Sequence, residues 1–182
     1  DRLKQTQMAL RHSLEQLAEA PLAQQEPALV ARIIQRSNEL QQSVTEMLER
    51  GQRRHLERNA LLSSLYQSQS YLRHLQDINR RYGSNVPDAQ QLMEMDRLIA
   101  AAIDTPSPRA TVQQLDAVAA MLPRSAAQPV VKAVLPDFNA ELGQLAPLSK
   151  QLEESDLAIS WYMFHIKALV AILNGDINQY VE

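Results

Sequence analysis

The feature that most constrains the fold is a segment from Ala28 to Tyr82 that contains no proline and a single glycine, Gly51. Large apolar residues recur along it every three or four positions, the spacing that places side chains on one face of an α-helix. They are Val30, Ile33, Ile34, Leu40, Val44, Met47 and Leu48 in the first half, and Leu61, Leu62, Leu65, Leu72, Leu75 and Ile78 in the second. The pattern predicts a helix that is far longer than the average in globular proteins.

A polar stretch from Glu49 to Arg58 separates the two apolar halves, and Leu56 is its only large apolar residue. Two structures fit this stretch. Either one continuous helix passes through a solvated waist, or Gly51 stops the first half and the two halves form a hairpin. The stretch is rich in Arg, Gln and Glu, which are good helix formers. We therefore favour the continuous helix, although a glycine inside a helix costs about 1 kcal/mol relative to alanine.

Shorter helices are predicted on both sides of this segment. Leu3, Leu10, Leu14 and Leu17 mark one from about Arg2 to Glu19, which Pro21 should end. Asp88 is a suitable N-cap for a helix that reaches about Ile103. Ser107, followed by Pro108, should cap another that reaches about Leu122. Ser125 should begin a further helix, with a kink at Pro136.

The final helix should begin near Pro147, and it meets no breaker before Gly175. Its apolar residues repeat every seven positions at Leu152, Ile159, Ile166, Leu173 and Tyr180. The stripe is widened by Tyr162, Met163, Leu169, Val170 and Ile177, so we expect this helix to be buried on more than one side. Its most apolar part, Leu157–Leu173, is about one turn short of a membrane span. We interpret that part as the core helix of a soluble bundle.

The composition agrees with helix nearly throughout. Leu, Ala, Gln, Glu and Arg dominate, glycine occurs four times, and no apolar and polar residues alternate over the length of a strand. The sequence therefore predicts an all-α protein, an elongated antiparallel helical bundle of two stacked modules that share the long helices. One module, with the short helices, covers about residues 60–147. The other is formed by residues 1–50 and 148–182.

Several classes of function are disfavoured. The net charge of −3 predicts neither nucleic acid nor an anionic membrane surface as a partner. The sequence has no cysteine, no glycine-rich phosphate loop and no G-x-S-x-G nucleophile motif. Its four histidines are far apart and lack the spacing of a zinc or di-iron site. We expect a chain that is not an enzyme and that needs no cofactor or metal.

Two groups of residues are candidates for binding. The first is the set of arginines within the polar stretch, Arg50, Arg53, Arg54 and Arg58, beside His55. Guanidinium groups bind carboxylates and phosphates with paired hydrogen bonds, so this set could hold an anion or an acidic partner surface. The alternative is a solvated helix face that is balanced by neighbouring glutamates.

The second group is the run from Trp161 to His165, which gathers three of the eight aromatic residues. Trp161, Tyr162 and His165 are its candidate binding residues, because aromatic faces attract cations. The alternative is an aromatic layer of the core, in which the polar tips of Trp161 and Tyr162 find hydrogen-bond partners.

The order of long and short helices, the polar waist and a chain that begins at Asp1 rather than methionine resemble the extracytoplasmic sensor region of bacterial receptor histidine kinases and chemoreceptors. The segment Leu40–Arg50, followed by Leu61–Leu75, is similar in residue pattern to the Gln- and Leu-rich long helix of one group of these sensors. That group is the helical bimodular type, typified by the trimethylamine N-oxide sensor kinase. Asp1 also leads us to expect a processed protein or a fragment.

The resemblance implies a periplasmic location, membrane contact only through flanking segments outside this chain, and a homodimer. It further implies that a small molecule or a periplasmic binding protein is detected, and that the signal passes by helix displacement. Two alternatives remain, a soluble helical adaptor or chaperone, which would be cytoplasmic, and a secreted effector that binds another protein.

Overall fold

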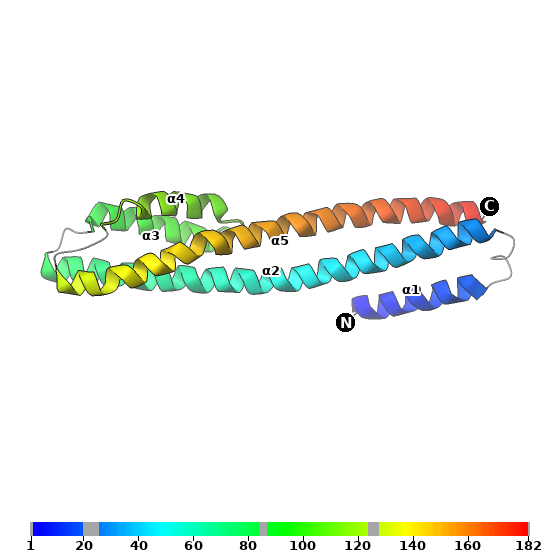
Figure 1. Cartoon of the computed structure of the whole chain (residues 1–182), viewed down its shortest axis with the longest axis horizontal. Coiled ribbons are helices and arrows are strands. Elements are labelled where there is room, and N and C mark those ends of the chain that lie inside the picture. Colours follow the sequence, from blue (N-terminus) through cyan, green and yellow to red (C-terminus); the bar gives the residue numbers. More distant parts are fainter. Residues whose placement is uncertain (1, 20–25, 84–86, 124–127, 182) are drawn as a thin grey trace. The chain divides into compact units, whose positions relative to one another are not determined.

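The computed structural model describes residues 2–19, 26–83, 87–123 and 128–181 (Figure 1). Within these ranges the chain forms α-helices and no strand, which confirms the all-α prediction. The helices are α1 (Arg2–Glu19), α2 (Pro27–Tyr82), α3 (Ala89–Asp104), α4 (Arg109–Ala119) and α5 (Pro129–Val181).

Helix α2 is continuous over 56 residues, so the hairpin alternative is wrong and the continuous helix is confirmed. Gly51 is helical, and a Cβ atom added to it would meet nothing within 4 Å. The helix ends at Tyr82, before Gly83, whose φ of +64° is a left-handed conformation that glycine adopts without strain. Arg80 and Arg81 lie in the last turn, where positive charge is favourable.

The start of α3 is as predicted from the sequence, whereas the start of α4 differs from the prediction. Asp88 Oδ1 accepts a hydrogen bond from the backbone N–H of Gln90 at 3.1 Å, which confirms the predicted cap. The N-cap of α4 is Pro108, with no side-chain cap, so the prediction that Ser107 caps this helix was wrong. The reason is that the Pro108 carbonyl already accepts the first helical bond, from Val112 at 2.8 Å. Helix α4 also ends at Ala119, earlier than predicted.

Helix α5 begins earlier than the final helix that we predicted. Pro136 and Pro147 both lie inside one helix of 53 residues, so the predicted start of a new helix near Pro147 was wrong. A proline inside a helix costs about 3 kcal/mol. Leu145 and Leu152, on either side of Pro147, are almost completely buried, and each such side chain stabilises the fold by about 1.5–3 kcal/mol. Ser125 and Pro21, the predicted start and stop signals, lie outside the described residues.

The chain divides into two compact units, each of which contains part of α2 and part of α5. Unit 2 is Gln52–Asp156 and includes α3 and α4, which lie side by side (Figure 1). Its core is one cluster of buried residues: Leu61, Leu65, Leu72, Leu75, Ile78, Leu92, Met95, Leu98, Ile99, Ala102, Val112, Leu115, Leu122, Val131, Leu135, Phe138, Leu142, Leu145 and Leu152. All four helical segments of unit 2 contribute to it.

Unit 1 is Asp1–Gly51 together with Leu157–Glu182. Within it, α1 lies along the first part of α2 (Figure 1). Its cluster of buried residues is small, with Leu29 and Ile33 of α2 and Leu173 of α5. Leu17, Leu40 and Tyr180 pack against this cluster and are only partly buried.

The α5 segment of unit 1 is not a buried core helix, and that prediction was wrong. Leu169 and Leu173 face inward, but Leu157, Trp161 and Phe164 are 64%, 57% and 76% exposed. The helix therefore packs on one stripe only, because among the described residues of unit 1 just α1 and the first part of α2 are present to cover it. By length and composition alone, α5 is the one helix among the described residues that is long and apolar enough to cross a membrane.

Candidate binding surfaces

The four predicted arginines lie on successive turns of α2, and they differ in what they contact. Arg54 forms an ion pair with Asp156 of α5. Arg58 Nη1 donates to the backbone carbonyl oxygen of Pro106, in the α3–α4 connection, at 3.3 Å. Both contacts lie within unit 2, where they join α2 to its neighbours. Arg53, in contrast, is exposed. Two of the four guanidinium groups are therefore already engaged in holding the fold.

The fourth arginine, Arg50, belongs to unit 1 and is half-buried. Its Nε atom is buried, and within the described part of the chain it has no hydrogen-bond partner. Its positive charge acts on Tyr162 of α5 and lowers the pKa of that phenol. The opposing and larger effect is the hydrogen bond between Tyr162 and Glu46, so the pKa of Tyr162 is raised from its ordinary value.

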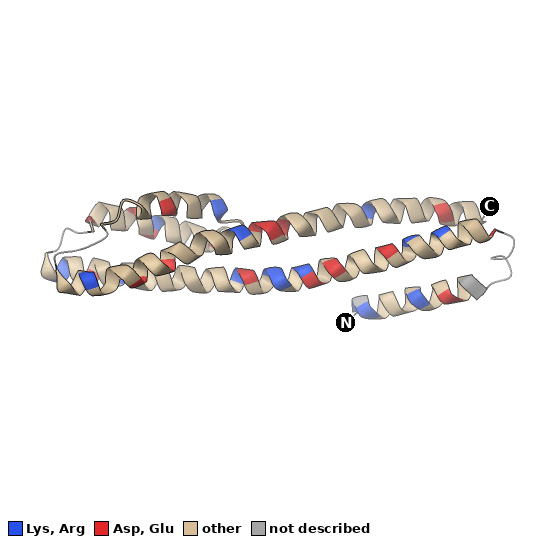
Figure 2. Cartoon of the chain, in the orientation of Figure 1, with Lys and Arg blue, Asp and Glu red and all other residues tan. Residues whose placement is uncertain are grey.

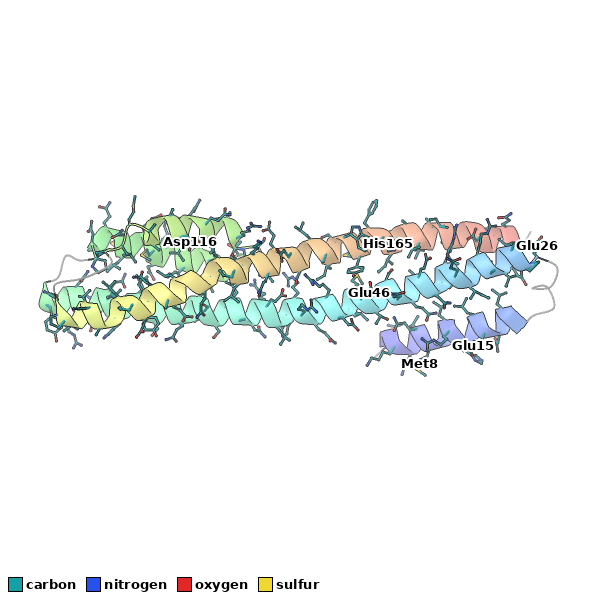
Figure 3. The ribbon with its side chains drawn as sticks, in the orientation of Figure 1. Met8, Glu15, Glu26, Glu46, Asp116 and His165 are labelled. Carbon is teal, nitrogen blue, oxygen red and sulfur yellow. The ribbon has the colours of Figure 1, made fainter. Side chains whose placement is uncertain are left out.

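The aromatic group is assembled but is not enclosed. The rings of Trp161 and His165 are stacked, with centroids 4.9 Å apart and an angle of 12° between their planes. Tyr162 meets Trp161 edge-on at 5.1 Å. Figure 3 labels His165 on α5 and Glu46, the hydrogen-bond partner of Tyr162, on α2. Because His165 covers one face of the indole ring and Tyr162 meets that ring edge-on, the three rings contact one another and do not surround a common space for a cation.

The structure thus divides the seven predicted site residues between the units. Trp161, Tyr162, His165 and Arg50 are in unit 1, and Arg53, Arg54 and Arg58 are in unit 2. Among the described residues, no three or more His, Asp or Glu side chains gather where they could hold a metal ion.

Sequence reasoning missed a polar groove between α1 and α2 in unit 1, with a volume of about 670 Å³. Its lining residues are Lys4, Gln7, Met8, Arg11, Asn38, Gln41, Gln42, Thr45, Glu46 and Glu49. Gln7 of α1 donates to Thr45 Oγ1 of α2 at 3.2 Å, so these two residues lie side by side in the register of the two helices. The groove could not be found from the sequence, because the sequence does not give that register.

An open depression in unit 2, of about 780 Å³, was missed for the same reason. It lies on α3 and the end of α4 and is lined by Asp88, Gln90, Gln91, Met93, Glu94, Arg97, Val118 and Met121. Arg97 is paired with Glu94 across one helical turn, and this pair lowers the pKa of Glu94.

The largest feature that was missed is an exposed apolar stripe on α5, here called the outer α5 face. It consists of Leu157, Trp161, Phe164, Ala168, Ala171 and Gly175, all of which are exposed. They follow one another at steps of four and three residues, which keeps them on one side of the helix. Figure 2 shows that this part of α5 carries few charged residues. The spacing was visible in the sequence, but we interpreted the whole segment Leu157–Leu173 as a buried core helix.

No family model, curated protein or solved structure matches the chain.

Proposed function

We propose that the chain is the extracytoplasmic sensing region of a bacterial transmembrane receptor of the two-component histidine kinase type. It binds a small molecule or a periplasmic binding protein, acts as a homodimer in the periplasm, and transmits its signal by displacement of long helices. The observation that carries this proposal is that α2 and α5 each contribute, as single unbroken helices, to both compact units.

A continuous helix supports this role because it moves as a unit. Packed helices shift or rotate by small steps more readily than they deform. A ligand that displaces α2 against α5 in unit 2 therefore also displaces the parts of the same helices that belong to unit 1. This is how a binding event at one place can be detected at another without any change in secondary structure.

The contacts between α2 and α5 suit a small displacement. In unit 2, Ser155 Oγ donates to Glu57 at 2.6 Å, and Ser64 Oγ donates to Glu141 at 2.8 Å. Both serines are buried. A hydrogen bond to a carboxylate contributes about 1.5–3 kcal/mol. At these two positions a serine, rather than an interlocked large apolar side chain, meets the facing helix, so a small shift there displaces no bulky group.

The first test of the proposal is the full-length coding sequence. We expect segments of about 20 apolar residues on each side of this region, the length that spans a bilayer, and a kinase domain beyond the second. A coding sequence without such segments would favour the soluble adaptor, for which the outer α5 face is a suitable binding surface.

The second test locks α2 to α5 in the intact receptor. Because this region contains no cysteine of its own, Glu57→Cys and Ser155→Cys introduce its only pair of thiols, which a short, reducible thiol-specific cross-linker can join. The cross-link should abolish the response to stimulus, and reduction should restore it. The same double variant without cross-linker, and each single variant treated with it, are the controls. A full response from completely cross-linked, membrane-inserted receptor would contradict transmission by helix displacement.

A further inference from the structure

We propose that the outer α5 face binds the same face of a second copy of this chain, with the two α5 helices parallel. Phe164 is 76% exposed, Leu157 64% and Trp161 57%. Side chains of this size dominate the energetics of interfaces when they become buried. The hydrophobic cost of leaving all three in water on one stripe indicates that something covers them.

The size of the face is sufficient for a specific dimer. From the exposure of its three large residues, together with Ala168, Ala171 and Gly175, it offers roughly 600 Å² per copy. If all of it were covered, two copies would bury at most roughly 1,200 Å², the lower limit of the range for specific protein interfaces. An interface of this size predicts a dimer that dissociates on dilution.

The charges on the face permit contact with an identical copy. None of its six residues is ionisable, so two copies meet without opposing like charges. Asp156 and Asp176, which adjoin the ends of the stripe, are paired with Arg54 and Arg36. Lys167 lies one residue before Ala168, at the margin of the stripe. In a parallel pair its aliphatic stem would pass beside Ile172 of the second copy rather than beside Lys167 of that copy.

The order of large and small residues gives the pair its shape. Leu157, Trp161 and Phe164 precede Ala168, Ala171 and Gly175 along α5. Small residues let two helices approach closely, whereas aromatic residues hold them apart. In a parallel pair the helices are therefore closest near Ala171 and diverge towards Leu157, where the aromatic side chains fill the space. The parallel orientation rests on the proposed function, because two receptors in one membrane point the same way.

A membrane is a poorer occupant of this face than a second copy. The opposite side of the same segment carries polar contacts that a lipid environment would disrupt. Tyr162 is hydrogen-bonded to Glu46, and the buried carboxylate of Asp176 lies 3.2 Å from Arg36. A helix that crosses a bilayer needs an apolar surface on every side that faces lipid.

The first experiment measures self-association by sedimentation equilibrium. The chain should form a dimer whose dissociation constant rises at least tenfold in Phe164→Glu, since residues at the centre of an interface dominate its affinity. The matched control is Met121→Glu, because Met121 is also 76% exposed but belongs to unit 2. A monomer at several hundred micromolar, or equal losses in the two variants, would overturn the interface.

The second experiment determines orientation by disulfide formation in the cysteine-free chain. In a parallel pair, Gly175→Cys should cross-link to itself, and a mixture of Leu157→Cys and Gly175→Cys should give no mixed dimer. In an antiparallel pair centred on residue 166, the two Gly175 positions would be about 27 Å apart and only the mixed dimer would form. That result would overturn both the parallel pair and its use in a receptor.

The third experiment tests lipid as the occupant. The chain should not float with vesicles of phosphatidylcholine and phosphatidylglycerol. Flotation that Phe164→Glu abolishes would assign the face to a membrane and overturn the proposal. A chain that neither dimerises nor floats overturns the interface alone, because the coding sequence and the locking of α2 to α5 test the proposed function independently.

Discussion

Units 1 and 2 use the same two helices with the same spacing of apolar residues, yet they bury very different amounts of them. Among the described residues, nineteen buried apolar residues form the cluster of unit 2, against three in the cluster of unit 1. In unit 2 the helices α3 and α4 add their own apolar faces to those of α2 and α5. Among the described residues of unit 1 only α1 is added, and one side of α5 is exposed. Within the described residues, α5 is therefore covered more completely in unit 2 than in unit 1.

Two phenylalanines on α5 show the difference at single residues. Phe138 in unit 2 is fully buried and meets Tyr71 edge-on at 6.5 Å. Phe164 in unit 1 is 76% exposed. The residue type and the helix are the same, so the contrast comes entirely from what packs against each segment.

The largest predicted effect comes from replacing these two residues. Phe138→Ala should reduce the free energy of unfolding of the chain by about 3–5 kcal/mol, the usual cost of emptying a packed aromatic site. Phe164→Ala should change it by no more than about 0.5 kcal/mol, as for other exposed positions, when measured at a concentration at which the chain is monomeric. Chemical denaturation followed by circular dichroism provides the measurement. Similar losses in both variants would mean that the two units are packed alike.

Hydrogen exchange should show the same contrast along α5. Amides between residues 135 and 145 should be protected at least roughly tenfold better than those between residues 162 and 172, because local opening is easier where fewer apolar contacts must be broken. Mass spectrometry of peptides from a dilute sample measures both regions together. Protection in the second region that increases with protein concentration would instead report the dimer.

Most of the secondary structure was predictable, because the spacing of apolar residues decides it locally. The bounds of α1 and the continuity of α2 through Gly51 follow from that spacing and from helix propensity. The break expected at Pro147 failed because local rules omit the tertiary burial of Leu145 and Leu152. The cap expected at Ser107 failed by one residue, a common limit for helix ends.

The candidate binding surfaces were less predictable than the fold. The sequence shows that Arg54 and Arg58 are on α2, but not that Asp156 and the Pro106 carbonyl would bind them. It also shows two apolar stripes on the last part of α5, but not that one of them is left exposed by the described residues. Both outcomes depend on which helices lie beside each face, and this information is not contained in the periodicity of a single helix.

Serines in the core of unit 2 provide a smaller test of its packing. Ser68 is fully buried, and its hydroxyl makes no hydrogen bond within the described residues. Ser68→Ala should therefore stabilise the chain by about 1 kcal/mol, since an unsatisfied buried polar group is removed. Ser64→Ala is the matched comparison and should destabilise by about 1.5–3 kcal/mol, because Ser64 donates to the carboxylate of Glu141. Thermal unfolding of both variants measures the two shifts. Destabilisation in both would indicate that Ser68 has a partner in solution.

The smallest predicted effect concerns Gly51, the last residue of the first segment of unit 1. Its backbone is helical, and a Cβ atom there has open space around it. Gly51→Ala should raise the free energy of unfolding by about 0.5–1 kcal/mol, because alanine loses less conformational entropy on entering a helix. The control is Gly83→Ala. Since Gly83 has a φ of +64°, alanine there is strained and should destabilise by about 1 kcal/mol.

The Gly51 variant also tests whether the two units unfold separately. If unit 1 is the weaker unit, a stronger helix at residue 51 should raise the midpoint of the earlier transition more than that of the later one. Differential scanning calorimetry separates the two transitions, and dilution keeps the chain monomeric. A loss of stability in Gly51→Ala would show that residue 51 is not helical in solution. Helix α2 would then be two helices rather than one continuous helix.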